Sequence, residues 1–254
     1  MISVLATMCA VFAISYLALG FVILYPLNKR WCAALANFAV RRYPRIIFAI
    51  LRAYANFRVL LSLELQKSLP PQYLVISNHQ SLLDIPVFML FLKDRARFVA
   101  KEELSRHVPI VAEILRAQEH CFLPRSGNMA RAMRAIDSFA QRVWKEKLIP
   151  VIFPEGTRSK DGTLGTFYQA GFRRFLDKRP MPVVVCALDG GYRISTLDGI
   201  IRKLTGGVYR LKILKIFPPP LSKREQIALL QEGKELIEAQ LKKWRAPAGR
   251  EAPT

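Results

Sequence analysis

The sequence predicts an α/β fold, a mixed β-sheet flanked by helices, carried on an N-terminal membrane helix. Three observations predict it. Two continuous apolar runs, 148–153 and 183–188, are typical of strands that helices bury on both faces. Residues 128–145 carry apolar side chains at helical spacing. Residues 1–27 contain no charged side chain, and the remaining length of the 254-residue chain suits one medium domain with appendages.

The uncharged start, residues 1–27, is long enough to cross about 30 Å of hydrocarbon as a helix. A cleaved signal peptide is the alternative, with Ala34, Leu35 and Ala36 resembling a cleavage site. However, the run is long for such a signal, and no Lys or Arg precedes it. Basic residues follow the run instead, namely Lys29, Arg30, Arg41, Arg42 and Arg45. We therefore expect a membrane protein of the bacterial inner-membrane type with its main domain on the cytoplasmic side. Whether the segment spans the bilayer or is re-entrant stays open.

Residues 28–65 are predicted to form two amphipathic helices in the membrane interface. Arg52 and Arg58 recur among apolar side chains, and Pro44 interrupts the run near its middle. The alternative is a second, poor membrane span. An arginine near the bilayer centre costs about 2.5–3.5 kcal/mol, so we favour interfacial helices whose arginines reach the headgroups.

Residues 66–220 are predicted to form the main domain, and residues 221–254 a C-terminal helix and tail. Strands are expected at 73–77, 97–100, 148–153, 183–188 and 209–217, and helices at 84–92 and 128–145. Ser222 and Glu225 have the spacing of a capping box for the last helix. The apolar stripe of that helix consists of Leu230, Ile237, Leu241 and Trp244.

The chain is strongly basic, with 39 Lys and Arg against 19 Asp and Glu and a net charge of +20. Nucleic acid is the usual partner of such a chain, but the apolar start disfavours it, and we expect no nucleic-acid partner. Anionic phospholipid is favoured, because each basic residue near an acidic leaflet contributes about 1 kcal/mol. An acidic carrier protein would bind the same surface. Four cysteines lie far apart without a Cys-x-x-Cys, so we expect neither a disulfide framework nor a metal site.

The segment NHQSLLD sets His79 five residues before Asp84. Imidazole is a base that works near neutral pH, and a carboxylate on one ring nitrogen directs the other toward a hydroxyl. We therefore predict His79 and Asp84 as catalytic residues. Ser77, Ser81 and Cys121 are the candidate nucleophiles for a covalent route. Neither serine lies in a Gly-x-Ser-x-Gly elbow, and small thiols are more often buried packing groups, so we expect no covalent intermediate on the enzyme.

The segment FPEGTRS follows an apolar run and contains Glu155, Gly156, Thr157 and Arg158, which we predict to bind substrate. A planar guanidinium binds two oxygens of a phosphate at once, which makes Arg158 the expected phosphate ligand. Gly156 permits a tight turn. Glu155 is expected to orient Arg158 or the acceptor.

Together, His-x-x-x-x-Asp and Phe-Pro-Glu-Gly-Thr-Arg, each after an apolar run, resemble the motifs of the 1-acyl-glycerol-3-phosphate acyltransferases, a glycerolipid acyltransferase family. The resemblance covers about residues 65–188 and implies that residues 66–220 form an acyltransferase domain of the glycerol-phosphate acyltransferase-like type. Lys101 and Arg125 match family residues at the acceptor phosphate. The chain departs from the family pattern at Ala112, Glu119 and Pro124.

The resemblance implies an enzyme that transfers a fatty acyl chain from acyl-CoA or acyl carrier protein, without a cofactor. The expected acceptor is the sn-2 hydroxyl of 1-acyl-glycerol-3-phosphate, and the product phosphatidic acid. Alternatives are another lysophospholipid or lyso-aminolipid as acceptor, or a non-catalytic membrane lipid-binding protein. Because Glu119 would add negative charge near the presumed phosphate, we hypothesise that acceptors with less anionic headgroups are also used.

Overall fold

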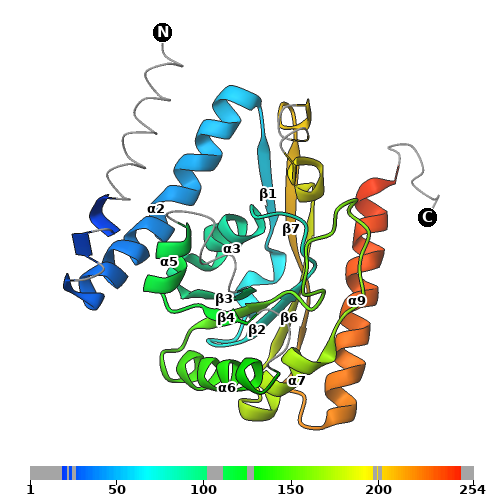
Figure 1. Ribbon diagram of the computed structural model, residues 1–254. Helices are drawn as coiled ribbons and strands as arrows, with labels where there is room; N and C mark the ends of the chain where they lie inside the picture. Colours follow the sequence, from blue (N-terminus) through cyan, green and yellow to red (C-terminus); the bar gives the residue numbers. More distant parts are fainter. Residues whose placement is uncertain are drawn as a thin grey trace.

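The computed structural model describes residues 19–21, 23–24, 27–101, 111–124, 129–196, 199 and 202–246, with the backbone alone at 101, 111 and 112. These residues contain a seven-stranded sheet in the order β1-β7-β6-β2-β5-β3-β4 (Figure 1). The strands are β1 (Arg58–Ser62), β2 (Leu74–Ser77), β3 (Ala96–Lys101), β4 (Cys121–Leu123), β5 (Ile149–Ile152), β6 (Val183–Asp189) and β7 (Val208–Phe217). Neighbours are parallel except β6 and β7, which are antiparallel. The predicted mixed sheet flanked by helices is therefore confirmed.

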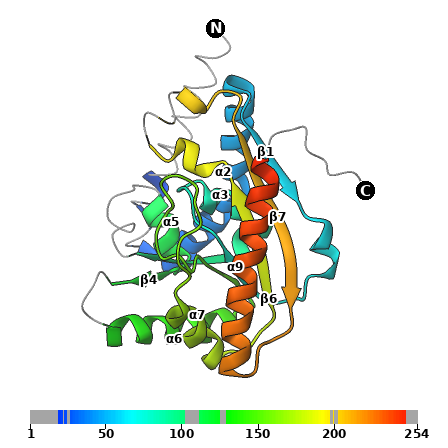
Figure 2. The same cartoon turned by 90° about the vertical axis from the view of Figure 1, so that its right-hand side faces the viewer.

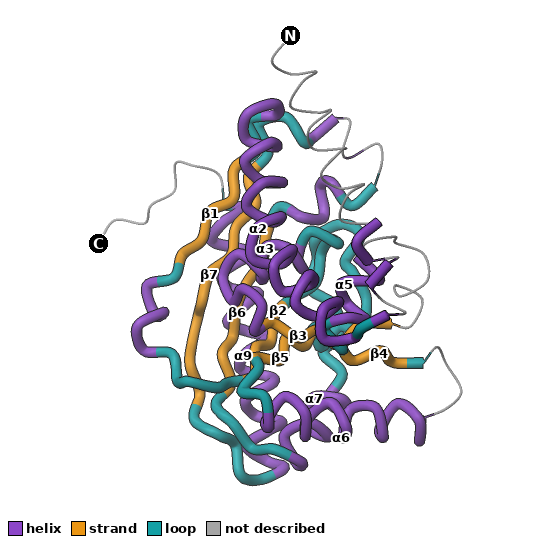
Figure 3. The backbone as a smooth tube through the Cα atoms, turned by 90° about the vertical axis from the view of Figure 1, so that its left-hand side faces the viewer, coloured by secondary structure: helices purple, strands orange, loops and turns teal. Residues whose placement is uncertain are grey.

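Helices cover both faces of the sheet. One face packs against α2 (Lys29–Ala55), α3 (Asp84–Leu92) and α5 (Val111–Ala117), which Figure 3 shows from their side. The other packs against α6 (Met129–Lys145), α7 (Gln169–Lys178) and α9 (Lys223–Arg245). Short 3-10 turns lie at Glu64–Ser68, Lys93–Arg95 and Gly191–Ile194.

The central strands read as continuous apolar runs because alternate side chains enter different cores. In β2, Leu74 and Ile76 pack toward α6, α7 and α9, whereas Val75 packs toward α2 and α3. All seven residues of β6 are buried. This double burial is why an apolar run, rather than an alternating one, predicted the sheet.

The predicted terminal helix is present as α9, and Figure 2 shows it running along the sheet across β6 and β7. Ser222 caps it, since its Oγ accepts the Glu225 amide at 3.2 Å. The Glu225 carboxylate accepts from the Leu221 amide at 2.8 Å, one residue earlier than in a reciprocal capping box.

The prediction of two helices broken at Pro44 is wrong, because α2 is one helix that contains Pro44. A proline inside a helix costs about 3 kcal/mol. Val40, Pro44 and Phe48 are all buried along the same side of α2, and this packing offsets the lost hydrogen bond. The helix ends at Asn56, whose left-handed backbone is one that asparagine tolerates.

Residues 58–62, predicted as part of the interfacial segment, form the edge strand β1 and pair with β7 in parallel. Their side chains are exposed or half-buried, so no apolar alternation marked them. The boundary of the sheet domain therefore lies before Arg58 rather than at residue 66.

The predicted anchor, residues 1–27, lies mostly outside the described residues. Among the described helices, none combines the length and apolar character that a membrane-spanning helix requires. Where described, this region has Phe21 buried against α2, while Leu19, Ile23 and Leu27 are exposed.

Candidate active site

The candidate site lies at the carboxyl ends of adjacent parallel strands, where open α/β sheets place their ligands. His79 follows β2, and Glu155 follows the neighbouring β5. Parallel pairing brings these two ends to the same edge of the sheet. The two motifs therefore meet although 76 residues separate them.

His79 and Asp84 lie in contact. The imidazole Nδ1 is 2.5 Å from Asp84 Oδ2, in a loop that ends where α3 begins. Asp84 is fully buried, whereas the His79 side chain is 18% exposed. No described group bonds the imidazole Nε2. This is the arrangement that general base catalysis requires, with one ring nitrogen held and the other accessible.

The Asp84 carboxylate is held by groups from two parts of the chain. It accepts from the backbone amides of Gln80 at 2.7 Å and Ser81 at 3.2 Å. The Tyr209 hydroxyl, on β7, donates to Oδ1. Burial, and then the charge of Asp84, raises the pKa of Tyr209 well above its ordinary value, so the phenol stays protonated as a donor. These bonds compensate a buried carboxylate that would otherwise be costly.

Tyr209 was missed from the sequence. It begins an apolar strand, where a tyrosine is ordinarily a packing residue, and no local pattern links it to Asp84.

Glu155 ties the two motif loops together. Its Oε1 accepts the His79 amide at 2.8 Å, and its Oε2 accepts the Gly165 amide at 2.8 Å. Glu155 is buried, and burial raises the pKa of its carboxyl while these two bonds oppose the shift. Both Glu155 oxygens are thus engaged by backbone amides, and none of the described ion pairs joins Glu155 to Arg158. The expectation that Glu155 orients Arg158 or the acceptor stays a prediction.

The turn after Glu155 presents Gly156, Thr157 and Arg158 to the surface. Gly156 has a φ of 65°, in the left-handed region that favours glycine. Among the described residues, Arg158 has no ion-pair partner. The next residue, Ser159, donates its amide to the His79 carbonyl at 2.8 Å. The guanidinium thus extends from a loop that is bonded to the His79 loop on both sides.

Two predicted residues are only partly placed. Lys101 closes β3, the strand next to β5, so it lies at the same edge of the sheet as the ends of β2 and β5, but its side chain is outside the described atoms. Arg125 lies outside the described residues.

Glu119 is not at the site. It precedes β4, at the amino ends of the parallel strands, whereas His79 and Glu155 follow carboxyl ends. Its carboxylate pairs with Arg142 of α6 at 3.0 Å. The hypothesis that Glu119 repels an acceptor phosphate is therefore wrong.

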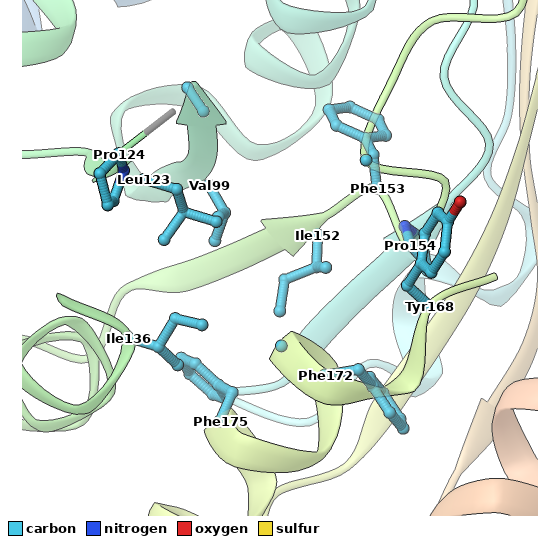
Figure 4. A pocket seen from close by; sticks show the side chains of 13 residues that line it. Val99, Leu123, Pro124, Ile136, Ile152, Phe153, Pro154, Tyr168, Phe172 and Phe175 are labelled. Carbon is cyan, nitrogen blue, oxygen red and sulfur yellow. The ribbon is translucent and has the colours of Figure 1, made fainter. Parts of the chain in front are cut away.

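An apolar cavity of about 530 Å³ adjoins the motif loops. Figure 4 shows Phe153, Pro154 and Tyr168 at one end, and Ile136 and Phe175, from α6 and α7, at the other. The Phe153 ring also stacks on the His79 imidazole, with centroids 4.2 Å apart and planes 11° apart. One side chain thus joins the cavity wall to the histidine.

A family model described as Acyltransferase matches residues 61–189, which include both motifs. The chain belongs to the acyltransferase family. The predicted enzyme class is confirmed, and the match contains β2 through β6, the strands that carry the His79 and Glu155 loops.

Relatives of this acyltransferase include the 1-acyl-sn-glycerol-3-phosphate acyltransferase of Cocos nucifera, 35% identical over 115 residues. That match covers 45% of this chain and 36% of the relative. The 1-acyl-sn-glycerol-3-phosphate acyltransferase beta of Homo sapiens is 29% identical over 146 residues, covering 57% and 50%. The matches thus span half or less of these relatives' lengths.

Among solved structures, the acyltransferase is similar to the 1-acyl-sn-glycerophosphate (LPA) acyltransferase PlsC from Thermotoga maritima. The TM-score is 0.60 at 22% identity, covering 94% of this chain and 99% of the other. This likeness shows a shared fold over almost the whole of both chains.

Proposed function

We propose that this acyltransferase transfers a fatty acyl chain from a thioester donor, acyl-CoA or acyl carrier protein, to the sn-2 hydroxyl of 1-acyl-glycerol-3-phosphate. The observation that carries the proposal is the bonding of the Arg158 loop to His79 through Glu155 and Ser159. These hydrogen bonds fix the loop that carries the proposed base against the loop that carries the proposed phosphate ligand. The names of the relatives support the same acceptor.

In the proposed reaction, His79 Nε2 takes the proton of the acceptor hydroxyl while its oxygen attacks the thioester carbonyl. A carbon–oxygen bond forms and the carbon–sulfur bond breaks. The departing thiolate receives the proton from the imidazolium, so the products are an ester and a free thiol. Asp84 holds Nδ1, which orients the ring and stabilises its charged form.

Direct transfer, without an acyl-enzyme, is supported by the state of the candidate nucleophiles. Ser77 and Ser81 are buried, and the Ser81 hydroxyl accepts the Leu83 amide. Burial raises the pKa of the Cys121 thiol to about 12, so little nucleophilic thiolate is present at neutral pH.

The decisive assay combines purified protein, labelled acyl-CoA or acyl carrier protein, and a panel of lysophospholipids, with products separated by mass. Acylated 1-acyl-glycerol-3-phosphate is the expected main product. Transfer only to other lysolipids would reject the proposed acceptor, and no transfer to any of them would reject the function.

Arg158→Lys is expected to raise the acceptor KM about tenfold while leaving the donor KM within about twofold. Lysine keeps the charge but cannot bind two phosphate oxygens at once as a guanidinium does. The substitution therefore removes about one charge-assisted hydrogen bond to the acceptor. Steady-state kinetics with each substrate varied in turn measures both constants. Lys160→Ala, which removes an exposed cation two residues later, is the control. Equal effects on donor and acceptor would argue against Arg158 at the phosphate.

The cavity beside Phe153 is proposed to hold the acyl chain of the donor, because its walls are mainly apolar. Gly171, on α7, lies in the wall facing Ile136. The cavity would then limit the length of the chain that the enzyme transfers.

Gly171→Leu is accordingly expected to shift the preference toward shorter acyl chains. Each methylene that loses its buried place forfeits about 0.8 kcal/mol, so two lower kcat/KM for the longest donors about tenfold. A donor series of increasing chain length measures this. Gly171→Ala is the matched control, since its added Cβ would lie 3.6 Å from Ile136 Cδ1, an ordinary contact. A uniform loss across all chain lengths would contradict the assignment.

Membrane association is also proposed, through the exposed apolar side chains of α2 and the residue before its cap. Leu27, Trp31 and Phe38 are 74%, 66% and 56% exposed. Such side chains, with the net positive charge, suit an anionic lipid surface. Sedimentation with anionic vesicles is expected to carry the protein down, less so in high salt. Equal sedimentation with neutral vesicles would remove the electrostatic part of this proposal.

A further inference from the structure

Arg245, the last residue of α9, lies over a buried carboxylate at the edge of the candidate site. Its Nη2 and Nε are 2.6 and 3.2 Å from Oδ1 of Asp189, which ends β6 and is 3% exposed. The guanidinium also lies over the Tyr192 ring, 5.0 Å from its centroid. A buried carboxylate that lost this partner would be costly, so the contact firmly joins the end of α9 to the sheet.

The same carboxylate reaches the His79 loop. Asp189 Oδ1 also accepts from Gln80 Nε2 at 3.4 Å, and Gln80 Oε1 accepts the Gly191 amide at 3.1 Å. Gln80 is fully buried, and its backbone amide donates to Asp84 Oδ2, the same oxygen that contacts His79 Nδ1. A continuous series of hydrogen bonds therefore runs from Arg245 to the imidazole.

Arg245 also contacts the loop that carries Arg158. Gly162 has a φ of 87°, and a Cβ added there would lie 2.7 Å from the Tyr192 ring and 2.9 Å from Arg245 Nη2. The Gly162 amide donates to the Ser159 hydroxyl at 2.9 Å, and Ser159 donates its amide to the His79 carbonyl. The loop is thus packed between Tyr192, Arg245 and the His79 loop.

We propose that Arg245 is a positioning residue. From the end of the C-terminal helix, it holds the His79 loop and the Arg158 loop in a fixed position relative to each other. It touches no substrate in this scheme and acts through Asp189, Gln80 and Gly162. The inference rests on the proposed function, because the relative position of the two loops affects the rate only if His79 and Arg158 act on the same acceptor molecule. Misplacement of reacting groups by about 1 Å can cost about a hundredfold in rate.

Arg245→Ala is expected to lower kcat by about ten- to a hundredfold, with both KM values changed less than about threefold. Arg245→Lys keeps an ammonium for Asp189 and is expected to recover a large part of the rate. Lys242→Ala is the control in the same helical turn. Among the described residues, Lys242 pairs with Glu238 at the surface, and its loss is expected to leave kcat unchanged.

Hydrogen exchange separates a positioning role from a purely structural one. Segments 79–84 and 159–165 are expected to exchange faster in Arg245→Ala, with the core strand β6 unchanged. A folded Arg245→Ala protein with wild-type kcat, or loop exchange equal to that of Lys242→Ala, would overturn the proposal. If Arg245→Ala does not fold, the same comparison uses Arg245→Gln, which keeps part of the side chain but not the positive charge at Asp189, and for which wild-type rate and exchange would be the contrary result.

The proposed function and this inference fail in different ways. Wild-type protein that transfers no acyl chain would reject the function. The exchange comparison would still decide whether Arg245 holds the two loops.

Discussion

His79→Ala is expected to reduce kcat by about 10²–10⁴-fold, the usual contribution of a positioned general base. The imidazole has one nitrogen on a fully buried carboxylate, and its side chain is partly exposed. The substitution removes the proton acceptor but keeps the hydrogen bonds that Glu155 and Ser159 make with the backbone of residue 79. Acceptor binding should therefore persist. Initial rates and equilibrium binding of 1-acyl-glycerol-3-phosphate measure the two effects separately.

His79→Gln serves as a second variant, because its amide fills part of the space beside Phe153 without supplying a base. Circular dichroism would establish that both variants are folded. Wild-type turnover in a folded His79→Ala protein would end the proposed mechanism. Loss of acceptor binding equal to the loss of rate would assign His79 to binding instead.

Asp84→Asn is expected to be comparably severe, about 10²–10⁴-fold in kcat, although it changes one atom. The carboxylate has two acceptor oxygens for His79, the two backbone amides and the Tyr209 hydroxyl. An amide has one oxygen, and its NH₂ would face at least one of these donors. If the NH₂ faces Nδ1, Nδ1 must accept its hydrogen bond, so the neutral ring carries its proton on Nε2. Nε2 is the nitrogen that must be unprotonated to act as the base.

Asp94→Asn is the matched control for the same chemical change, since Asp94 pairs with Arg41 at 2.7 Å on the surface of the molecule. It should leave kcat unchanged. Retention of full activity in Asp84→Asn would show that the carboxylate charge and ring tautomer are immaterial. Partial recovery in Asp84→Asn combined with Tyr209→Phe would indicate that the unmatched hydroxyl contributes to the loss.

Elements with strong local patterns were predictable from the sequence. The 128–145 segment repeats apolar residues at helical spacing and forms α6, whose Ile136, Phe139 and Val143 are buried. The run at 183–188 lies within β6, buried on both faces. In each case the same side chains that set the pattern also make the packing contacts, so local sequence was sufficient.

The β1 strand had no such pattern. Its side chains are half-buried at a sheet edge, and its partner β7 lies about 150 residues later along the chain. Parallel pairing over that separation depends on the order of all the intervening strands. The local pattern of residues 28–65 therefore predicts a segment at the membrane surface, and it does not indicate that residues 58–62 belong to the sheet.

The sequence by itself determined the chemistry of the candidate site: a histidine with a carboxylate five residues away, and an arginine after a glycine turn. Only the tertiary structure decided what holds these groups, namely Glu155 across to His79, and Tyr209 on Asp84 from 125 residues away. The physical reason is the range of the interactions. A side chain's partner within one loop follows from spacing, whereas partners on other strands follow from sheet order and register, which no local pattern encodes.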